Sequence, residues 1–296
     1  MSLASNRAGL LFATLGAIGF SFKAIFVKLA YRYGVDAETL LALRMGFSLP
    51  FFVVMGLVAD ARATHRMDGR DWLWMAALGF SGYYLSSYLD FLGLRYISAA
   101  LERLILFLYP TLVIVLSALF LAKPIGRRTL AALALCYCGI GLAVGHDLHV
   151  AGDARDVVVG GTLVFVSALS YALYLMGNGQ VVGRLGAMRV TAFATSVASV
   201  LCIVQFLVLR PVSALDQPWQ VYALGVAMAL MSTVAPVWLV SEAIRRLGAG
   251  PVSLMGTLGP VVTILLGWLL LDEVLGLSQL AGTALVIAGV LVMARR

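Results

Sequence analysis

The stretch Arg245–Val292 reads RRLGAGPVSLMGTLGPVVTILLGWLLLDEVLGLSQLAGTALVIAGVLV, and a related stretch occurs at Arg95–Leu142. When one is shifted by about 150 residues, they align without a gap and share about 15 identities in about 48 positions. Leucine matches mean little in so apolar a chain, but matched prolines and glycines mark fixed backbone requirements. The anchoring matches are Arg245 on Arg95, Ala249 on Ala99, Pro260 on Pro110, Leu271 on Leu121, Gly276 on Gly126 and Gly289 on Gly139. The chain therefore contains two related halves.

The composition places these halves in a membrane. The chain is 62% hydrophobic and 12% charged, with a mean hydropathy of +1.00, whereas a soluble domain carries about 25% charged residues. A helix needs about 20 apolar residues to cross a bilayer. We therefore predict an all-α membrane protein of ten transmembrane helices, at residues 8–31, 37–59, 72–93, 97–121, 128–145, 157–176, 187–209, 218–244, 250–271 and 277–294.

Charge and cysteine content exclude two other interpretations. The net charge is +7, but the basic residues gather at the ends of the predicted helices, which indicates membrane topology rather than nucleic-acid binding. Cys136, Cys138 and Cys202 all lie in apolar runs, and Cys136 and Cys138 would point to different faces of one helix. The sequence therefore predicts no disulfide, no metal site and no cofactor.

The distribution of lysine and arginine predicts the orientation. Of the 21 such residues, 13 lie at the two termini and in the even-numbered loops, and only 5 lie in the odd-numbered loops. Because positive charge favours the cytoplasmic side, both termini are predicted to be cytoplasmic. Five helices per half is an odd number, so the second repeat (157–296) would be inverted relative to the first (1–146). Inverted repeats are an architecture of secondary transporters, with the substrate held near the membrane midplane.

The second half also carries a family signature. The run Leu269–Glu273 (LLLDE), followed by Gln279, Gly282 and Gly289, resembles the closing signature of the drug/metabolite transporter superfamily. Over essentially the whole chain the sequence is similar to its ten-helix, EamA-like exporters, and within them to the YddG-type bacterial exporters of aromatic amino acids. The first half departs from the signature, with Lys123-Pro124 where the second has Glu273-Val274.

This resemblance implies a function and a location. It implies a secondary transporter of the bacterial inner membrane, possible as a monomer, which exports small amphipathic metabolites through a central cavity by alternating access. Aromatic amino acids are the expected substrates, and a carrier of purines, nucleotide sugars or sulfur metabolites is the alternative. Outside transport, a membrane scaffold or sensor remains open. The sequence leaves open whether transport is coupled to protons.

An enzyme is not predicted. Gly79-Phe80-Ser81-Gly82 matches the serine motif of intramembrane proteases, whose chemistry needs a histidine within hydrogen-bonding reach of the serine. The only histidines are His65, His146 and His149, and all three lie in predicted polar loops.

Charges inside predicted helices are the first candidate functional residues, because each costs several kcal/mol in hydrocarbon unless it is paired or hydrated. We expect a structural layer of ion pairs from Asp90, Arg95, Glu102 and Arg103. Lys23 and Arg44 lie deeper and on neighbouring helices, where either could bind a substrate carboxylate or pair with Asp90 or Glu102.

Aromatic and hydroxyl side chains supply a candidate cavity wall, since together they suit a flat, amphipathic solute. Lipid-facing aromatics and close helix packing are the alternative interpretation for many of these positions. With Lys23 and Arg44, the predicted cavity residues are Phe20, Ser21, Phe80, Tyr83, Tyr84, Ser87, Ser170, Tyr171, Tyr174, Ser232 and Trp238. The repeat-related Pro110 and Pro260 are predicted hinges, because a proline removes a backbone hydrogen bond and kinks its helix.

Overall fold

The computed structural model describes residues 3–63, 66–121, 126–151, 153–248 and 255–294, together with Val252. Helices make up these ranges almost entirely, and no strand occurs within them, which confirms the all-α prediction. His65, Lys123-Pro124 and Ala249 lie outside the described residues. The helical elements are α1 (Leu3–Tyr31), α2 (Ala37–Ala61), α3 (Gly69–Leu78), η1 (Gly79–Leu85), α4 (Ser86–Gly93), α5 (Ala99–Leu106), α6 (Tyr109–Leu121), α7 (Arg127–Ala151), α8 (Ala154–Leu185), α9 (Ala187–Leu209), η2 (Val212–Leu215), α10 (Trp219–Ala229), η3 (Leu230–Val234), α11 (Ala235–Leu247), α13 (Leu258–Leu271) and α14 (Leu277–Ala294).

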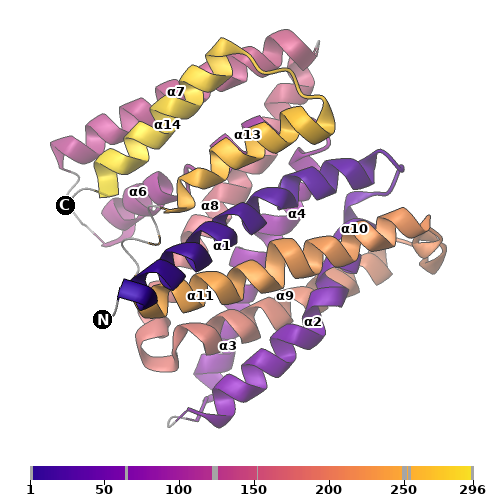
Figure 1. The fold of residues 1–296 in the computed structure, drawn as a ribbon. Coiled ribbons are helices and arrows are strands. Elements are labelled where there is room, and N and C mark those ends of the chain that lie inside the picture. Colours follow the sequence, from indigo (N-terminus) through magenta and orange to yellow (C-terminus); the bar gives the residue numbers. More distant parts are fainter. Residues whose placement is uncertain are drawn as a thin grey trace.

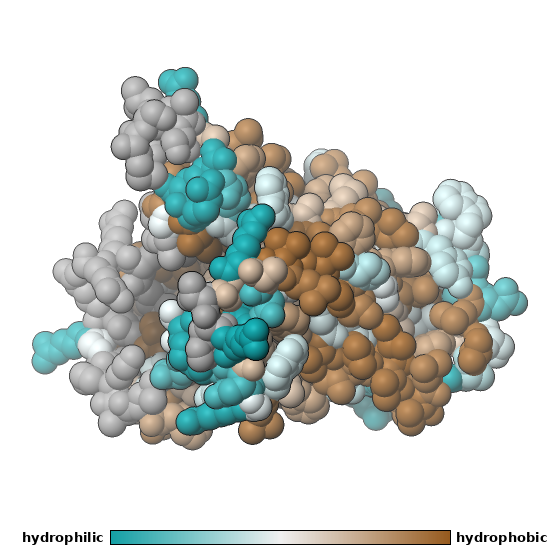
Figure 2. Space-filling model, turned by 90° about the horizontal axis from the view of Figure 1, so that it is seen from below, coloured by the Kyte–Doolittle hydropathy of each residue, from teal (hydrophilic) through white to brown (hydrophobic). Residues whose placement is uncertain are grey.

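Seven helices in the described residues are long and apolar enough to cross a membrane, and Leu258–Leu271 and Leu277–Val292 are shorter apolar helices. The predicted span at 72–93 is helical throughout (α3, η1 and α4) but is not among either group. Its serines, tyrosines, glycines and Asp90 lower its hydropathy, which is typical of a helix that faces other helices rather than lipid. The surface in Figure 2 shows a broad hydrophobic area with hydrophilic residues toward its two ends, as a membrane protein requires.

The two halves of the chain interlock. The tightest pairings join α7 to α14, α2 to α9, α1 to α11, α4 to α8 and α1 to α13, and each of these pairs takes one helix from each half. In Figure 1, α7 and α14 lie side by side along one edge of the bundle, while the start of α1 and the end of α14 lie at the same end. We call that end the termini end, and the other, where α1 finishes, the far end.

Small residues let α7 and α14 approach closely. A Cβ atom on Gly139 of α7 would lie 2.5 Å from the carbonyl oxygen of Gly282 of α14, and one on Gly289 would lie 2.8 Å from the carbonyl oxygen of Ala132. The shift that aligns the two halves of the sequence places Gly139 on Gly289 and Ala132 on Gly282, so the two contacts are equivalent by the repeat. Close backbone approach through small residues is how membrane helices gain packing energy without a hydrophobic effect.

The two interrupted helices position the site. In the first half, α5 ends at Leu106, two non-helical residues follow, and α6 begins at Tyr109 directly before Pro110. In the second half a turn at Thr257 precedes α13 and Pro260. A proline cannot donate to the preceding turn, so both interruptions follow from the repeat-related prolines.

Two π-helical segments form a second repeat-related pair. Segment η1 separates α3 from α4, and η3 separates α10 from α11, at positions that the same shift superimposes to within one residue. In each segment a hydroxyl bonds a carbonyl about one turn back, as Ser81 does to Ala77 (2.9 Å) and Thr233 to Met228 (2.9 Å). Such segments are frequent at functional sites.

Replacing Gly139 by alanine should lower the thermal unfolding midpoint of the purified protein. The new methyl group meets the carbonyl oxygen of Gly282, and overpacking of this kind costs about 1–3 kcal/mol. Gly141→Ala is the matched control on the same helix, because no described atom lies within 4 Å of its added Cβ. Alanine favours a helix over glycine by about 1 kcal/mol, so the control should be neutral or stabilising. Equal losses in both variants would contradict the close approach of α7 and α14.

Candidate functional site

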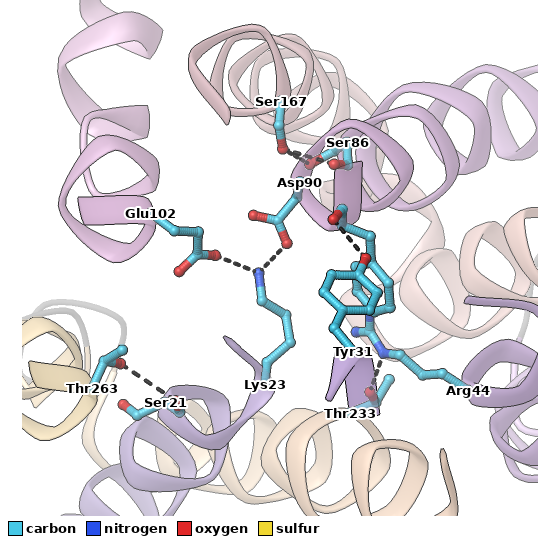
Figure 3. A network of polar contacts seen from close by, with 11 residues as sticks. Ser21, Lys23, Tyr31, Arg44, Ser86, Asp90, Glu102, Ser167, Thr233 and Thr263 are labelled. Carbon is cyan, nitrogen blue, oxygen red and sulfur yellow. Dashed lines mark hydrogen bonds and ion pairs between the residues drawn. The ribbon is translucent and has the colours of Figure 1, made fainter. Parts of the chain in front are cut away.

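A half-buried lysine joins three helices at the centre of the bundle. The Lys23 Nζ of α1 lies 2.6 Å from the Asp90 Oδ2 of α4 and 2.9 Å from the Glu102 Oε1 of α5. Figure 3 shows the ammonium between the two carboxylates. The side chains of Lys23, Asp90 and Glu102 are 15%, 2% and 0% exposed. Isolated, each charge would cost several kcal/mol at this depth, so the three depend on one another.

These pairings settle which of the expected ion pairs form. Asp90 and Glu102 pair with Lys23, rather than with the nearer residues in sequence, Arg95 and Arg103. Arg95 is exposed, and among the described residues neither arginine forms an ion pair. The Asp90 Oδ1 and both carboxylate oxygens of Glu102 have no hydrogen-bond partner in the described residues, so Glu102 is held by the charge of Lys23.

Hydroxyl groups surround this triad and tie the two halves together (Figure 3). The Arg44 Nε of α2 donates to the Thr233 hydroxyl of η3 at 3.0 Å, and its guanidinium lies 5.5 Å from the centre of the Phe91 ring. The Ser21 hydroxyl donates to the Gly259 carbonyl at 3.1 Å, and the Thr263 hydroxyl donates to the Ser21 carbonyl at 3.4 Å.

Further hydrogen bonds join α4 and η1 to α8. The Ser86 and Ser167 hydroxyls lie 3.1 Å apart, and Ser167 also donates to the Ser86 carbonyl at 2.7 Å. The Ser170 hydroxyl donates to the Ser81 carbonyl of η1 at 2.7 Å. Ser170 thus satisfies a carbonyl in the π-helical segment, where the regular helical bonds are interrupted.

Four tyrosines form a continuous aromatic row. The ring of Tyr83 lies 5.1 Å from that of Tyr174, Tyr174 lies 5.5 Å from Tyr171, and Tyr171 lies 5.4 Å from Tyr109. The Tyr83 and Tyr174 hydroxyls are 3.1 Å apart. We call these four residues the tyrosine row. It brings together η1, α8 and the first residue of α6, so that it ends at the interruption before Pro110.

Arg103 of α5 lies one turn before the interruption that separates it from Tyr109, the end of this row. Its Nε is buried without a hydrogen-bond partner in the described residues. The guanidinium contacts Gly259 of α13 so closely that a Cβ there would lie 2.7 Å from the Arg103 Nη2. The missing side chain of Gly259 therefore makes room for the guanidinium.

The remaining predicted cavity residues are more scattered. Phe80 and Trp238 are 48% and 51% exposed, and their rings pack against Tyr84 (5.5 Å) and Phe12 (5.9 Å). Ser232 is buried and bonds the Met228 carbonyl of its own helix at 2.9 Å. Phe20, Tyr84 and Ser87 are half-buried.

The far end of the bundle is held together by hydrogen bonds and ion pairs. The Ala99 backbone N–H, at the start of α5, donates to the Glu273 Oε1 at 2.7 Å, and the Ser98 N–H donates to the Asp147 Oδ2 at 3.1 Å. Burial raises the pKa of Glu273, while the Ala99 N–H and the charge of Lys28 act in the opposite direction. The His146 ring is bonded to the Val274 carbonyl at 2.9 Å.

A cavity of about 320 Å³ opens at this same end. It lies between the ends of α1, α4 and α13, beside the capped start of α5. Its charged lining is mainly basic, which would favour an anionic group. The lining residues are Lys28, Tyr31, Arg32, Leu94, Arg95, Leu271 and Glu273.

Sequence reasoning did not identify Tyr109 and Gly259 as site residues. Each stands directly before one of the repeat-related prolines, and the alignment of the halves places Tyr109 on Gly259. The two halves thus differ at this position, with a large residue in one and the smallest residue in the other, directly before the proline. This difference could have identified both residues from the sequence.

The fold and this site define a class of protein. Helices long and apolar enough to cross a membrane surround a buried network of charges and hydroxyls, with interrupted helices at its edge. Charged groups at membrane depth mark pathways for substrates and ions, and interrupted helices are typical of transporters. The chain is a multi-pass membrane transporter.

The comparison with known families agrees. The model of the EamA-like transporter family matches residues 7–145 and, separately, residues 158–295. The chain therefore belongs to the EamA-like transporter family, within the drug/metabolite transporter superfamily.

Relatives across this family have similar lengths. The chain is 30% identical to the uncharacterized transporter YcbK of Bacillus subtilis, over 93% of this chain and 89% of that one. It is 25% identical to an uncharacterized transporter of Archaeoglobus fulgidus (94% and 95%) and 23% identical to a WAT1-related protein of Arabidopsis thaliana (93% and 86%). A solved chain described as "Crystal structure of protein" shares the fold, with a TM-score of 0.64 and 17% identity over 97% of this chain and 96% of that chain. Relatives named as transporters make this protein a transporter rather than an enzyme.

Lys23→Met should destabilise the protein strongly, because it leaves two buried carboxylates without their cation. Breaking a buried ion pair from one side costs about 3–5 kcal/mol. The measurement is thermal or denaturant unfolding of the purified protein in detergent. Lys28→Met is the matched control on the same helix, since Lys28 is 25% exposed and 3.9 Å from its nearest carboxylate oxygen. A loss for Lys23→Met no larger than for the control would contradict the structural role of the triad.

Proposed function

We propose that the protein is a secondary transporter that exports small amphipathic metabolites, with aromatic amino acids as its substrates, by alternating access. In this proposal ten helices form two inverted five-helix repeats, residues 1–146 and 157–296, and both termini face the cytoplasm of a bacterial cell. The tyrosine row beside an unpaired arginine is the observation that carries the substrate assignment. The interrupted helices carry the assignment of the mechanism.

Features that occur once in each half support alternating access. The prolines, the helix interruptions, the π-helical segments and the α7–α14 contacts all occur in pairs that the sequence repeat superimposes. If the second repeat takes the conformation of the first, and the first that of the second, the site becomes open to the other side of the membrane.

The bonds at the far end define one state of this cycle. The contacts of Glu273 with the Ala99 N–H and of Asp147 with Ser98 hold α5, α7 and the α13–α14 loop together. With cytoplasmic termini, the far end is the outer end. These bonds would break when the transporter opens outward, and the loop that carries Glu273 would move away from α5.

Geometry also favours an aromatic substrate over the alternatives. Four tyrosines from three elements offer ring faces, and aromatic pairs contribute about 0.5–1.5 kcal/mol beyond their buried area. Their hydroxyls supply hydrogen bonds for a polar end of the solute. A purine could stack on the same rings, so the transport assay includes one.

The substrate is tested by flux into proteoliposomes of the purified protein. Radiolabelled phenylalanine, tryptophan and a purine are compared, with and without a pH gradient, which also tests proton coupling. Saturable flux of the amino acids is expected. Flux of the purine alone would overturn the substrate assignment and keep the transporter, while no flux of any of them from folded protein would favour the scaffold or sensor alternative.

Tyr171→Ala should raise the KM for phenylalanine about two- to tenfold, because it removes one ring from the middle of the row. Tyr137→Ala is the matched control, since Tyr137 is 43% exposed on α7. Equal effects of the two variants on flux would place the substrate away from the tyrosine row.

Pro110→Ala and Pro260→Ala should lower the maximal rate of transport more than they change KM. Each restores a backbone N–H at an interrupted helix and so opposes the hinge motion that exchange of the halves requires. Pro50→Ala is the control, because Pro50 lies inside α2, which continues without interruption. Unchanged maximal rates in both hinge variants would show that the prolines are ordinary kinks.

A further inference from the structure

We propose that Arg103 receives the substrate's carboxylate, and that Lys23 does not. The inference rests on the proposed function and adds the residue that recognises the charged end of the solute. It assigns to the site a ligand with a carboxylate next to an aromatic ring.

Lys23 is already paired with two acids. Its ammonium donates to the Asp90 Oδ2 at 2.6 Å and lies 2.9 Å from the Glu102 Oε1. A substrate carboxylate at Lys23 would add a third negative charge to a site that holds two. Like charges in so buried a site repel strongly, so Lys23 is unsuited to an anionic group.

Arg44 is held by other contacts. Its Nε donates to the Thr233 hydroxyl, and its guanidinium lies over the Phe91 ring. Arg44 is 7% exposed and belongs to the wall between α2 and η3. Its Nη1 has no partner in the described residues, but the ring beside its guanidinium is Phe91 rather than a member of the tyrosine row.

Arg103 has the properties that the other two lack. No carboxylate in the described part of the chain pairs with it, and its Nε is buried without a partner. A buried donor that lacks a partner costs about 1–3 kcal/mol, more when it is charged. Such a cost is explained if a ligand supplies the acceptor. A guanidinium also matches the planar, two-oxygen geometry of a carboxylate better than an ammonium does.

The surroundings of Arg103 favour the same ligand. Arg103 lies one turn before the interruption at which the tyrosine row ends, so a ring on the tyrosine row would direct its carboxylate toward this arginine. Helix α6 begins at Tyr109, and the amino-terminal end of a helix carries a partial positive charge. The neighbouring Glu102 is held by Lys23, which limits its repulsion of an incoming anion.

Two variants test Arg103 by different routes. Arg103→Gln removes the charge directly, with Arg155→Gln, an exposed arginine of α8, as its control. Gly259→Ala keeps the arginine but displaces its guanidinium, whose Nη2 lies 2.7 Å from the new Cβ. An arginine tip is flexible, so this variant should fold. Gly256→Ala is its control, since no described atom lies within 4 Å of the added Cβ.

Binding is measured apart from transport. The shift in thermal unfolding midpoint is recorded with phenylalanine, with 3-phenylpropionate, which keeps the carboxylate, and with phenethylamine, which lacks it. Flux of phenylalanine is measured on the same preparations. Both carboxylates should stabilise the wild type and phenethylamine should not. Arg103→Gln and Gly259→Ala should each weaken carboxylate binding about tenfold to a hundredfold, with unliganded stability close to the wild type.

The outcomes separate the two claims. If both variants lose carboxylate binding but the wild type shows no phenylalanine flux, the proposed function is overturned and Arg103 remains an anion site. Carboxylate binding that survives in both variants, or that is absent from the wild type, would overturn the assignment of Arg103. A large loss of unliganded stability in Arg103→Gln would also overturn it, because a structural ion pair rather than a free donor would then be present.

Discussion

The ammonium of Lys23 between Asp90 and Glu102 is the constraint on which the interior depends. These three side chains come from α1, α4 and α5, and none of them could be buried alone without a penalty of several kcal/mol. Their mutual pairing therefore fixes the positions of three helices relative to one another. It also consumes the lysine and both acids, and so leaves Arg103, one residue beyond Glu102, as the cation available to a solute.

Symmetric features and asymmetric features have different roles in this molecule. Interrupted helices, π-helical segments and close glycine contacts occur once in each half, and they concern how the backbone bends and packs. The three charges of the central triad, in contrast, all come from the first half. The frame is therefore shared between the halves, whereas the chemistry that would distinguish one solute from another is concentrated on one side of it.

The sequence predicted the frame better than the site. Hydropathy predicted the all-α membrane fold, and the closing signature of the second half indicated the family. The matched prolines pointed to both interruptions, because a proline acts on the backbone locally. Partners of charged groups depend on long-range packing, so the sequence offered both Arg95 and Arg103 and the deeper Lys23 as partners of the acids, and the structure has Lys23. Helical spacing also assumed regular α-helix across Gly79–Leu85, where η1 changes the direction of Tyr83, and it gave no reason to notice Gly259.

The π-helical segment has a consequence for how the chain tolerates insertions and deletions. In an α-helix each residue turns the helix by about 100°. A π-helical turn accommodates one residue more, so deletion of a single residue anywhere in Gly79–Leu85 could restore a regular helix with almost no change in composition. Because the π-helical turn holds the extra residue within one turn, the side chains after such a deletion would keep their directions, and Asp90 would still face Lys23. The same deletion in a regular part of the helix between this turn and Asp90 would rotate Asp90 by about 100° and break its pairing with Lys23.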